Sequence, residues 1–367
     1  MKLLEHKAKE VLSKHGIPVP RGVVTSTADF VKDFPYPAAI KAQVPIGGRG
    51  KAGGIKFAQD FEQAKEHVEQ IIGMDIRGYD VKQVLVEEMV HPDRELYLSL
   101  MIDRREGSTL LMASSEGGVD IESVPDEKMF KTHISPLIGI QPFVLRNMNK
   151  SLGLEKDLGK KLGGLLTKCY QAYESEDAEL IEINPLIVTK EGEFVAVDAK
   201  VTIDDNALRR HPEYQDMPQD LSELEEEAKK KGIAFVKLDG DIGVIANGAG
   251  LTMATLDVLN AKGGKGGVFL DLGGTDDPER VKEAFYLIRK AKPSVILLNI
   301  FGGITKCDTV ALGVKEAIEE KKMEVPVVAR IKGLHEQRAK EILKDAGMIP
   351  TDTISQAAEE AARLGGS

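Results

Sequence analysis

The last third of the chain alternates short apolar runs with segments of helical pattern, and this alternation constrains the fold more than any other feature. The runs are apolar on both faces, as in strands that helices cover on two sides. Strands that alternate with helices form units in which successive strands are parallel. We therefore predict a doubly wound parallel sheet. Its expected strands are Ile242–Ala246, Val268–Leu272, Val295–Phe301, Val325–Ile331 and a short strand near Ile349.

Helical patterns fill the gaps between these runs and also begin the chain. At the N-terminus, Lys2–His15 places its apolar residues on one side of a helix, and Gly16 is a natural residue to end it. Further helices are expected to begin near Leu251, Pro278, Lys306 and His335, and a last helix closes the chain.

The chain changes character near residue 232, where a mixed pattern of strands and helices gives way to the regular alternation. The segment before this point, Met217–Lys231, has glutamates first and lysines last, an order that suits the helix dipole. We interpret it as a solvated helix that leads into a second domain. The expected organisation is an α+β domain over residues 1–231 and an α/β domain over residues 232–367.

Charge and composition argue against several classes of protein. The formal net charge of −10 at pH 7 argues against a nucleic-acid-binding chain, which needs clustered lysine and arginine. The longest strongly apolar run, Val295–Phe301, is too short to cross a membrane. Cys169 and Cys307 lack metal-binding or redox spacing, and we find no secretory signal, so we expect a cytoplasmic, reducing environment.

A glycine-rich segment between two strand-like runs is the first candidate site. It contains five glycines within residues 39–56, accompanied by the cations Lys41, Arg49, Lys51 and Lys56. Glycines let backbone N–H groups approach a phosphate closely, and the cations neutralise its charge. A mobile surface hairpin is the simpler alternative, but the charges favour a phosphate-binding loop. The segment lacks the G-x-x-x-x-G-K-[ST] pattern of a Walker A loop.

A second candidate site lies on a hairpin expected to turn around Glu191. If the turn is symmetric, Asn184 faces Asp198, and Glu182 faces Lys200. Opposed side chains have Cβ atoms about 5 Å apart, so an amide oxygen and a carboxylate can bind one hard cation. A polar outer face with a cross-strand ion pair explains the spacing equally well. The buried face is expected to carry the odd-numbered residues Ile181, Ile183, Val195, Val197, Ala199 and Val201.

Glycine-containing turns follow three of the expected parallel strands, at Asn247–Gly250, Gly273–Gly274 and Gly302–Gly303. The carboxyl ends of such strands share one edge, where ligands bind, and a helix N-terminus there offers free N–H groups to an anion. An anion-binding edge is one interpretation, and tight turns that need glycine are the other. The G-x-G-x-x-G fingerprint is absent, which argues against a nicotinamide-dependent oxidoreductase.

In their order along the chain, these residues resemble the β-subunits of succinyl-CoA synthetase, also called succinate–CoA ligase. The resemblance implies an ATP-grasp N-terminal domain and a flavodoxin-like C-terminal domain. The segments that carry it are Glu5–Lys9, Gly47–Gly54, Glu95–Tyr97, Ser115–Gly118, Ile181–Leu186, Asn247–Met253 and Asn299–Ile304.

The resemblance implies a ligase of the tricarboxylic acid cycle that catalyses succinate + CoA + ATP ⇌ succinyl-CoA + ADP + phosphate. In this family Mg²⁺ accompanies the nucleotide, and a histidine of a separate α-subunit carries the phosphoryl group. CoA and succinate would be shared with that α-subunit in an αβ or α₂β₂ assembly. No histidine of this chain lies in a Gly-His-Ala-Gly type of loop, so we expect the partner to supply that residue.

The resemblance also implies roles for individual residues. Glu182 would steady the phosphohistidine, and Asn184 and Asp198 would hold Mg²⁺. The nucleotide would be bound by Lys41, Gly48, Arg49, Gly50, Glu87, Val90 and Glu95. The organic acid would be contacted by Asn247, Gly303, Ile304 and Thr305.

Two alternatives remain beside a succinate ligase. Thr305 stands where we expect an aliphatic residue in this family, so malate or another small acid is an alternative substrate. A non-catalytic, nucleotide-binding regulatory subunit is the other alternative. The presence of Lys41, Glu182, Asn184 and Asp198 together argues against it. Pro20 and the glycine-rich segment resemble ADP-forming relatives more than GDP-forming ones.

Overall fold

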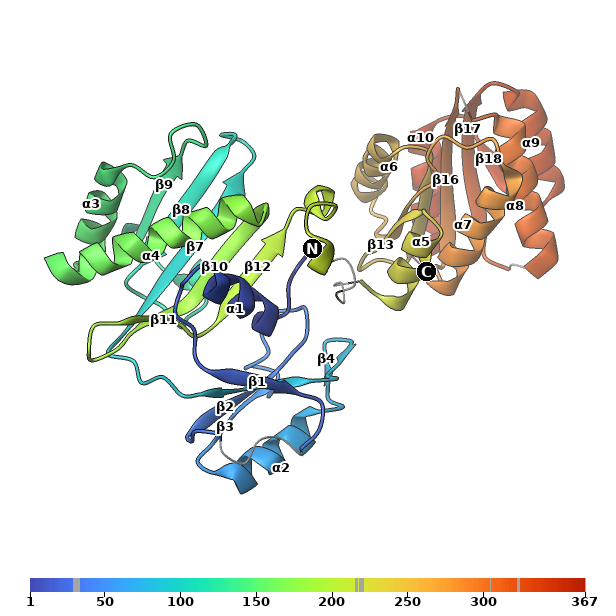
Figure 1. Ribbon diagram of the computed structural model, residues 1–367. Coiled ribbons are helices and arrows are strands. Elements are labelled where there is room, and N and C mark those ends of the chain that lie inside the picture. Colours follow the sequence, from blue (N-terminus) through green and yellow to red (C-terminus); the bar gives the residue numbers. More distant parts are fainter. Residues whose placement is uncertain (29–33, 215–216, 218–220, 304, 322–323, 367) are drawn as a thin grey trace. The chain divides into compact units, whose positions relative to one another are not determined.

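The computed structural model describes residues 1–28, 34–214, 217, 221–303, 305–321 and 324–366. The chain divides into two compact units, Met1–Asp220 and Leu221–Ser367 (Figure 1). This division precedes the expected boundary after residue 231, because helix α5 (Glu223–Lys230) packs on strand β13 (Ala234–Lys237) of the second unit. Ala228 of α5 is fully buried in the core of that unit.

The first unit begins with a small antiparallel sheet in the order β1-β6-β2-β3, which helix α2 covers. The side chain of Asp60 accepts a hydrogen bond from the N–H of Gln63 and so caps the start of α2. A two-stranded ribbon, β4–β5, packs beside this sheet through the buried Ile76. The elements are β1 (Gly22–Thr25), β2 (Ala38–Ala42), β3 (Ile55–Ala58), α2 (Phe61–Ile71), β4 (Asp75–Ile76), β5 (Tyr79–Asp80) and β6 (Val84–Glu88).

A larger antiparallel sheet completes the first unit, in the order β11-β10-β7-β8-β9, with β12 also paired to β10. Helix α1 ends before Gly16, whose φ of 71° is the left-handed conformation expected there. Three helices share one core with this sheet: α1 (Glu5–Lys14), α3 (Pro142–Ser151) and α4 (Lys156–Ser175). The strands are β7 (Arg94–Asp103), β8 (Ser108–Ser114), β9 (Met129–Ile134), β10 (Ala178–Val188), β11 (Phe194–Ala196) and β12 (Ala199–Ile203).

Four short 3₁₀ helices are found among the described residues of this unit. They are η1 (Ile121–Ser123), η2 (Asp126–Lys128), η3 (Asp205–Ala207) and η4 (Pro212–Tyr214).

The β10 hairpin has the expected register, because Glu182 pairs with Lys200 and the N–H of Asn184 donates to the carbonyl oxygen of Asp198 at 3.1 Å. The expected buried face was only partly correct. A register shift between Ile183 and Leu186 exchanges the two faces beyond that point, since a shift by one residue turns each following side chain to the other side. Of the odd-numbered residues expected on the buried face, Ile181, Ile183, Ala199 and Val201 are buried. Beyond the shift the core takes Leu186, Val188, Phe194 and Ala196 instead of Val195 and Val197.

The second unit is the doubly wound sheet that the alternating pattern predicted. The parallel strands lie in the order β15-β14-β16-β17-β18, which is the flavodoxin-like order, and β13 pairs antiparallel with β15 at one edge. The edge strand β13 was not expected from the sequence. The parallel strands are β14 (Ile242–Ala246), β15 (Gly266–Asp271), β16 (Val295–Gly302), β17 (Val327–Gly333) and β18 (Ile349–Thr351).

Helices cover both faces of this sheet, which explains why its strands are apolar on both sides. On one face α6 and α10 form a core with the sheet, and on the other α7, α8 and α9 form a second core (Figure 1). All five residues of β14 are buried. Within the described part of the chain, no helix is both long and apolar enough to cross a membrane. The helices are α6 (Ala249–Ala261), α7 (Pro278–Lys290), α8 (Cys307–Lys321), α9 (Glu336–Asp345) and α10 (Ile354–Gly365).

Candidate functional site

A cavity of about 650 Å³ in the first unit brings the two candidate sites of that unit together. The glycine-rich segment lines it with residues 46–51, and the β10 hairpin lines it with Glu182, Asn184 and Asp198. Residues 118–122, which follow β8, complete its wall. Segments far apart in the sequence therefore meet at one site, as a phosphate loop and a cation site must if they serve one nucleotide.

The glycine-rich segment presents a row of unpaired backbone donors. Among the residues that the structure describes, the N–H groups of residues 47–51 have no hydrogen-bond acceptor. Gly47, Gly48 and Gly50 are exposed, and Gly48 has a φ of 79°. Successive N–H groups that point into a concave surface form an anion-binding site. The segment therefore offers the free backbone donors that a phosphate-binding loop needs.

Lys41 and Arg49 are paired with carboxylates in a buried charge cluster. Arg49 donates to Glu5 at 2.5 Å, and Lys41 donates to Glu5 at 3.0 Å. Lys41 also contacts Glu87, and Arg49 lies 3.1 Å from a carboxylate oxygen of Asp198. We use the name charge cluster for Glu5, Lys9, Lys41, Arg49, Glu87 and Asp198, in which three cations balance three carboxylates.

The charge cluster shifts the protonation equilibria of its members. Burial works to raise the pKa of Glu5, but Lys41, Lys9 and Arg49 outweigh it and hold that pKa well below its ordinary value. Burial works to lower the pKa of Lys41, but Glu5 and Glu87 outweigh it and raise that pKa. Both groups are therefore charged at neutral pH. Their charges compensate one another where burial would otherwise be costly.

The pKa values of the Asp198 and Glu182 carboxyl groups are raised, in contrast to that of Glu5. Burial, aided by the charge of Glu5, raises the pKa of Asp198, and burial raises the pKa of Glu182. These two carboxyl groups hold a proton more readily than carboxyl groups in water do. A cation or a hydrogen-bond donor that enters the cavity would reverse this tendency, because it favours the charged form.

Asn184 and Asp198 fit a hard divalent cation by their chemistry. Both line the cavity from adjacent positions of one hairpin, and they offer an amide oxygen and a carboxylate, the donors that Mg²⁺ prefers. The Asn184 Oδ1 atom accepts a hydrogen bond from the N–H of Gly118 at 2.7 Å, and its Nδ2 donates to the carbonyl oxygen of Val119 at 3.0 Å. These bonds fix the orientation of the amide of a residue that lines the cavity.

Three further residues expected to bind the nucleotide, Glu87, Val90 and Glu95, lie in different surroundings. Glu87 is 1% exposed and belongs to the charge cluster, not to the cavity wall. Val90 is half-buried between β6 and β7. Glu95 is the second residue of β7 and lies beside Gly118 of the cavity wall, because a Cβ atom built on Gly118 would lie only 2.1 Å from its Oε2 atom.

The expected acid-binding residues lie at the carboxyl edge of the second sheet. Asn247 follows β14 and Gly303 follows β16, the two strands between which the strand order reverses, and such a switch point is where ligands bind in these sheets. The Asn247 side chain exchanges two hydrogen bonds with the backbone of Phe301, each of 2.9 Å. Ile304 lies outside the described residues.

At this edge, two side chains form hydrogen bonds within the protein that the sequence did not indicate. Thr305 is 1% exposed and its hydroxyl accepts a hydrogen bond from the N–H of Thr275 at 3.1 Å, so the hydroxyl is used within the protein. The carboxylate of Asp271 accepts from the N–H of Gly248 at 2.5 Å and from that of Gly273 at 2.7 Å. The Asp271 carboxylate therefore already accepts hydrogen bonds from backbone N–H groups at two of the glycine turns.

The sequence alone did not single out several residues that the structure brings to the site. Glu5 and Lys9 contributed only to the family motif, although their spacing of four residues in a helix permits an ion pair. Gly118 and Val119 hold Asn184, and Arg77 lines the cavity from the β4–β5 turn. No local pattern marks the contacts of Gly118, Val119 and Arg77, because these residues meet segments distant in the sequence.

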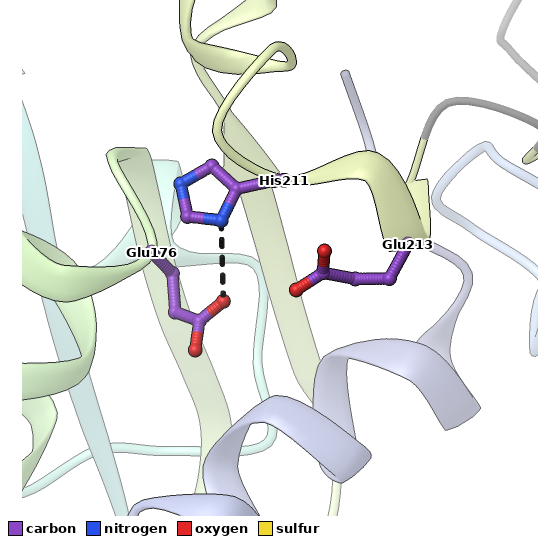
Figure 2. Close-up of side chains that lie close together, drawn as sticks. All are labelled: Glu176, His211 and Glu213. Atoms are coloured by element: carbon purple, nitrogen blue, oxygen red, sulfur yellow. Dashed lines mark ion pairs between the residues drawn. The ribbon is translucent and has the colours of Figure 1, made fainter.

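A second group of side chains lies away from the cavity. Glu176, His211 and Glu213 approach one another with donor atoms within 4.8 Å, as a metal site would require (Figure 2). However, the Glu176 carboxylate already accepts from Lys14 at 2.7 Å and from the hydroxyl of Tyr214 at 2.7 Å. We interpret the group as a structural ion-pair network that joins the end of α1, the end of α4 and η4.

Another cavity, of about 660 Å³, lies in the second unit at the start of α9. It is lined by Asp308, Gly333, His335, Glu336, Gln337 and Arg338, none of which the sequence singled out as a binding residue. His335 lies 3.0 Å from Asp308 through its Nδ1 atom.

Comparison with known proteins agrees with this architecture. The ATP-grasp domain model matches residues 2–188, and the CoA-ligase model matches residues 245–364. The chain is 43% identical over 373 residues to the succinate–CoA ligase (ADP-forming) subunit beta of Ignicoccus hospitalis, with 99% of each chain covered. It is 46% identical over 380 residues to the succinate–CoA ligase (GDP-forming) subunit beta of Thermus thermophilus, with both chains fully covered at 100%.

A solved structure supports the fold at greater evolutionary distance. The ATP citrate lyase of Methanothrix soehngenii, in complex with citrate and coenzyme A, superposes with a TM-score of 0.70 and covers 99% of each chain. The sequence identity is 17%, so this likeness concerns the fold alone.

Proposed function

The chain belongs to the family of succinate–CoA ligase β-subunits, and from this premise we propose that it binds the nucleotide of a ligase that joins succinate to CoA. The reaction is succinate + CoA + ATP ⇌ succinyl-CoA + ADP + phosphate, and it requires a separate α-subunit. One observation carries the proposal: a single cavity is lined by the unpaired N–H groups of the glycine-rich segment and by Asn184 and Asp198.

The phosphate chain of the nucleotide lies in the cavity against the N–H groups of residues 47–51. Arg49 releases the carboxylate of Asp198 and donates a hydrogen bond to a phosphate oxygen instead. Lys41 contributes further positive charge to the phosphate site. Asn184 and Asp198 are the residues that would hold Mg²⁺, which when bound neutralises charge that develops on the phosphoryl group. Glu95, beside Gly118 of the cavity wall, accepts hydrogen bonds from the ribose hydroxyls.

The phosphoryl group passes to a histidine of the α-subunit and from there to succinate, and the acyl phosphate is then attacked by the CoA thiol. A covalent relay of this kind replaces one difficult transfer by easier steps. Glu182 accepts a hydrogen bond from the far nitrogen of that imidazole and so orients it. Asn247 and Gly303, at the carboxyl edge of the second sheet, contact the organic acid, and the buried Thr305 orders the turn beside them through its hydrogen bond with Thr275.

The test combines the purified chain with the α-subunit of the same organism, [γ-³²P]ATP and Mg²⁺. We expect acid-labile label on the α-subunit only when this chain is present. Asp198→Asn should lower the labelling rate on the order of 100-fold, because it removes a charged cation ligand. Asp93→Asn, an exposed change outside the cavity wall, is the matched control. A stable complex that binds ATP but never labels the α-subunit would contradict the relay.

Nucleotide choice, location and assembly are finer parts of the proposal. Relatives of both ADP-forming and GDP-forming type are similar to this chain, and we propose ATP as the substrate. Labelling with [γ-³²P]GTP in parallel tests this choice. Two buried free thiols, Cys169 and Cys307, suit the cytoplasm, where thiols stay reduced. The mass of the complex in solution separates αβ from α₂β₂.

A further inference from the structure

Arg77 shares the cavity of the first unit with the glycine-rich segment. It occupies the turn of the β4–β5 ribbon, in which Ile76 pairs with Tyr79. Ile76 is 1% exposed and fixes the ribbon to the end of the glycine-rich segment, since a Cβ atom built on Gly54 would lie 2.7 Å from its Cδ1 atom. The turn that carries Arg77 is therefore held in place by packing.

The guanidinium of Arg77 lies directly beside Gly48. A Cβ atom built on Gly48 would meet the Nη2 atom of Arg77 at 3.1 Å. The cationic group thus borders the row of unpaired N–H groups, and together they surround the same space.

Arg77 differs from Lys41, Arg49 and Lys51 in having no anionic partner. Among the residues that the structure describes, its guanidinium forms no hydrogen bond or ion pair. Arg49 and Lys41 are balanced by carboxylates in the charge cluster, and Lys51 lies 2.6 Å from Asp120. An incoming anion must displace a carboxylate at those three residues but not at Arg77.

The backbone conformation of Arg77 indicates that its side chain has a role of its own. Its φ is 54°, in the left-handed region. For a residue other than glycine or asparagine this conformation is sterically unfavourable. A turn residue chosen for the backbone alone would be glycine or asparagine, so the arginine here is best explained by what its side chain binds.

We propose that Arg77 is a further phosphate-binding residue of the nucleotide site, contacting the terminal phosphates of the nucleotide through its planar guanidinium. The charge cluster is balanced in itself, so a nucleotide with several negative charges gains most from a cation that is still unpaired. The inference rests on the proposed function, because it names a residue for the same nucleotide.

Binding of MgADP and MgATP to the complex with its α-subunit tests the inference by calorimetry. Arg77→Gln should weaken both nucleotides roughly tenfold, as expected for loss of a charge-assisted hydrogen bond, and leave adenosine binding unchanged. Arg77→Lys should restore part of the affinity. Lys82→Gln is the matched control, since Lys82 is an exposed cation close in sequence that does not line the cavity.

The outcomes separate this inference from the proposed function. If wild-type complex binds neither nucleotide, the proposed function itself is wrong. If wild type binds both and Arg77→Gln binds them equally well, only the role of Arg77 is overturned. If Arg77→Gln lowers the labelling of the α-subunit while nucleotide affinity is unchanged, the guanidinium serves the phosphohistidine and the assignment to the nucleotide is wrong.

Discussion

At the scale of single residues, the site depends on how its cations are balanced. Glu5 accepts hydrogen bonds from Lys9, Lys41 and Arg49, and its own side chain is almost fully buried. Buried charges are costly unless each has a partner, so these cations are kept charged and ordered before any nucleotide binds. In the proposed binding mode, a phosphate oxygen would replace a carboxylate oxygen at Arg49, so the nucleotide would exchange one anionic partner for another.

A prediction at this scale concerns the acid stability provided by Glu176. Burial opposes its ionisation, but hydrogen bonds from Lys14, His15 and Tyr214 outweigh burial and lower its pKa from 4.5 to about 2. A carboxyl group whose pKa is lowered by folding stabilises the protein above its unfolded pKa and loses that contribution as the pH falls. Glu176→Gln should therefore lower the free energy of unfolding by about 2 kcal/mol at pH 7, and by progressively less between pH 4.5 and 2.

Urea unfolding followed by circular dichroism at several pH values measures this difference. Glu213→Gln is the control, because Glu213 is an exposed neighbour of the same network. A destabilisation by Glu176→Gln that is constant from pH 7 to pH 3 would show that the ionised carboxylate is not what stabilises the network.

At the scale of elements, the site is built where β10 meets the segment that follows β8. That segment passes close to β7, because a Cβ atom built on Gly117 would lie 2.4 Å from the carbonyl oxygen of Leu96. The next residue, Gly118, donates to Asn184. The lack of a side chain at Gly117 therefore sets the distance between the cavity wall and the sheet.

A glycine comparison tests this arrangement. Gly117→Ala should destabilise the protein by about 2–3 kcal/mol, because β7 or the following segment must move, and it should weaken nucleotide binding through Gly118. Gly164→Ala in α4 is the control, since Gly164 is exposed in a helix with nothing within 4 Å of the added Cβ atom. That change should stabilise by about 0.5–1 kcal/mol. Thermal unfolding measures both, and equal effects would refute the steric explanation.

At the scale of the whole molecule, the chain consists of two units with separate hydrophobic cores. The second unit includes α5, whose Ser222 and Glu225 form a capping box at its start. Glu227 of this helix pairs with Lys290 of α7 at 2.6 Å. The helix is thus part of the second unit and not a free linker.

Two fragments test this division. A fragment of residues 221–367 should fold alone with one cooperative transition, because its core is complete. A fragment of residues 232–367 lacks α5 and should be less stable by about 2 kcal/mol, since it exposes the surface that Ala228 covers. Urea unfolding of both fragments gives the difference. Equal stability would place the boundary after residue 231, as the sequence first indicated.

The sequence by itself determined the elements whose pattern repeats locally. Strand β14 begins and ends where the apolar run predicted, and the symmetric turn around Glu191 predicted that Glu182 pairs with Lys200. Both follow from residues close together in the chain, whose side-chain period and turn chemistry are readable without tertiary contacts.

Only the tertiary structure decided which partners the site residues have. The pairing of Arg49 with Glu5, the place of Arg77 beside Gly48 and the exchange of faces beyond Ile183 all depend on segments that are distant in the sequence. A local pattern fixes the period of a segment, but burial and charge pairing are set by whatever the completed fold packs against it. The chemistry of the site could therefore be anticipated from its residue types, whereas its electrostatic balance emerged only from the packed fold.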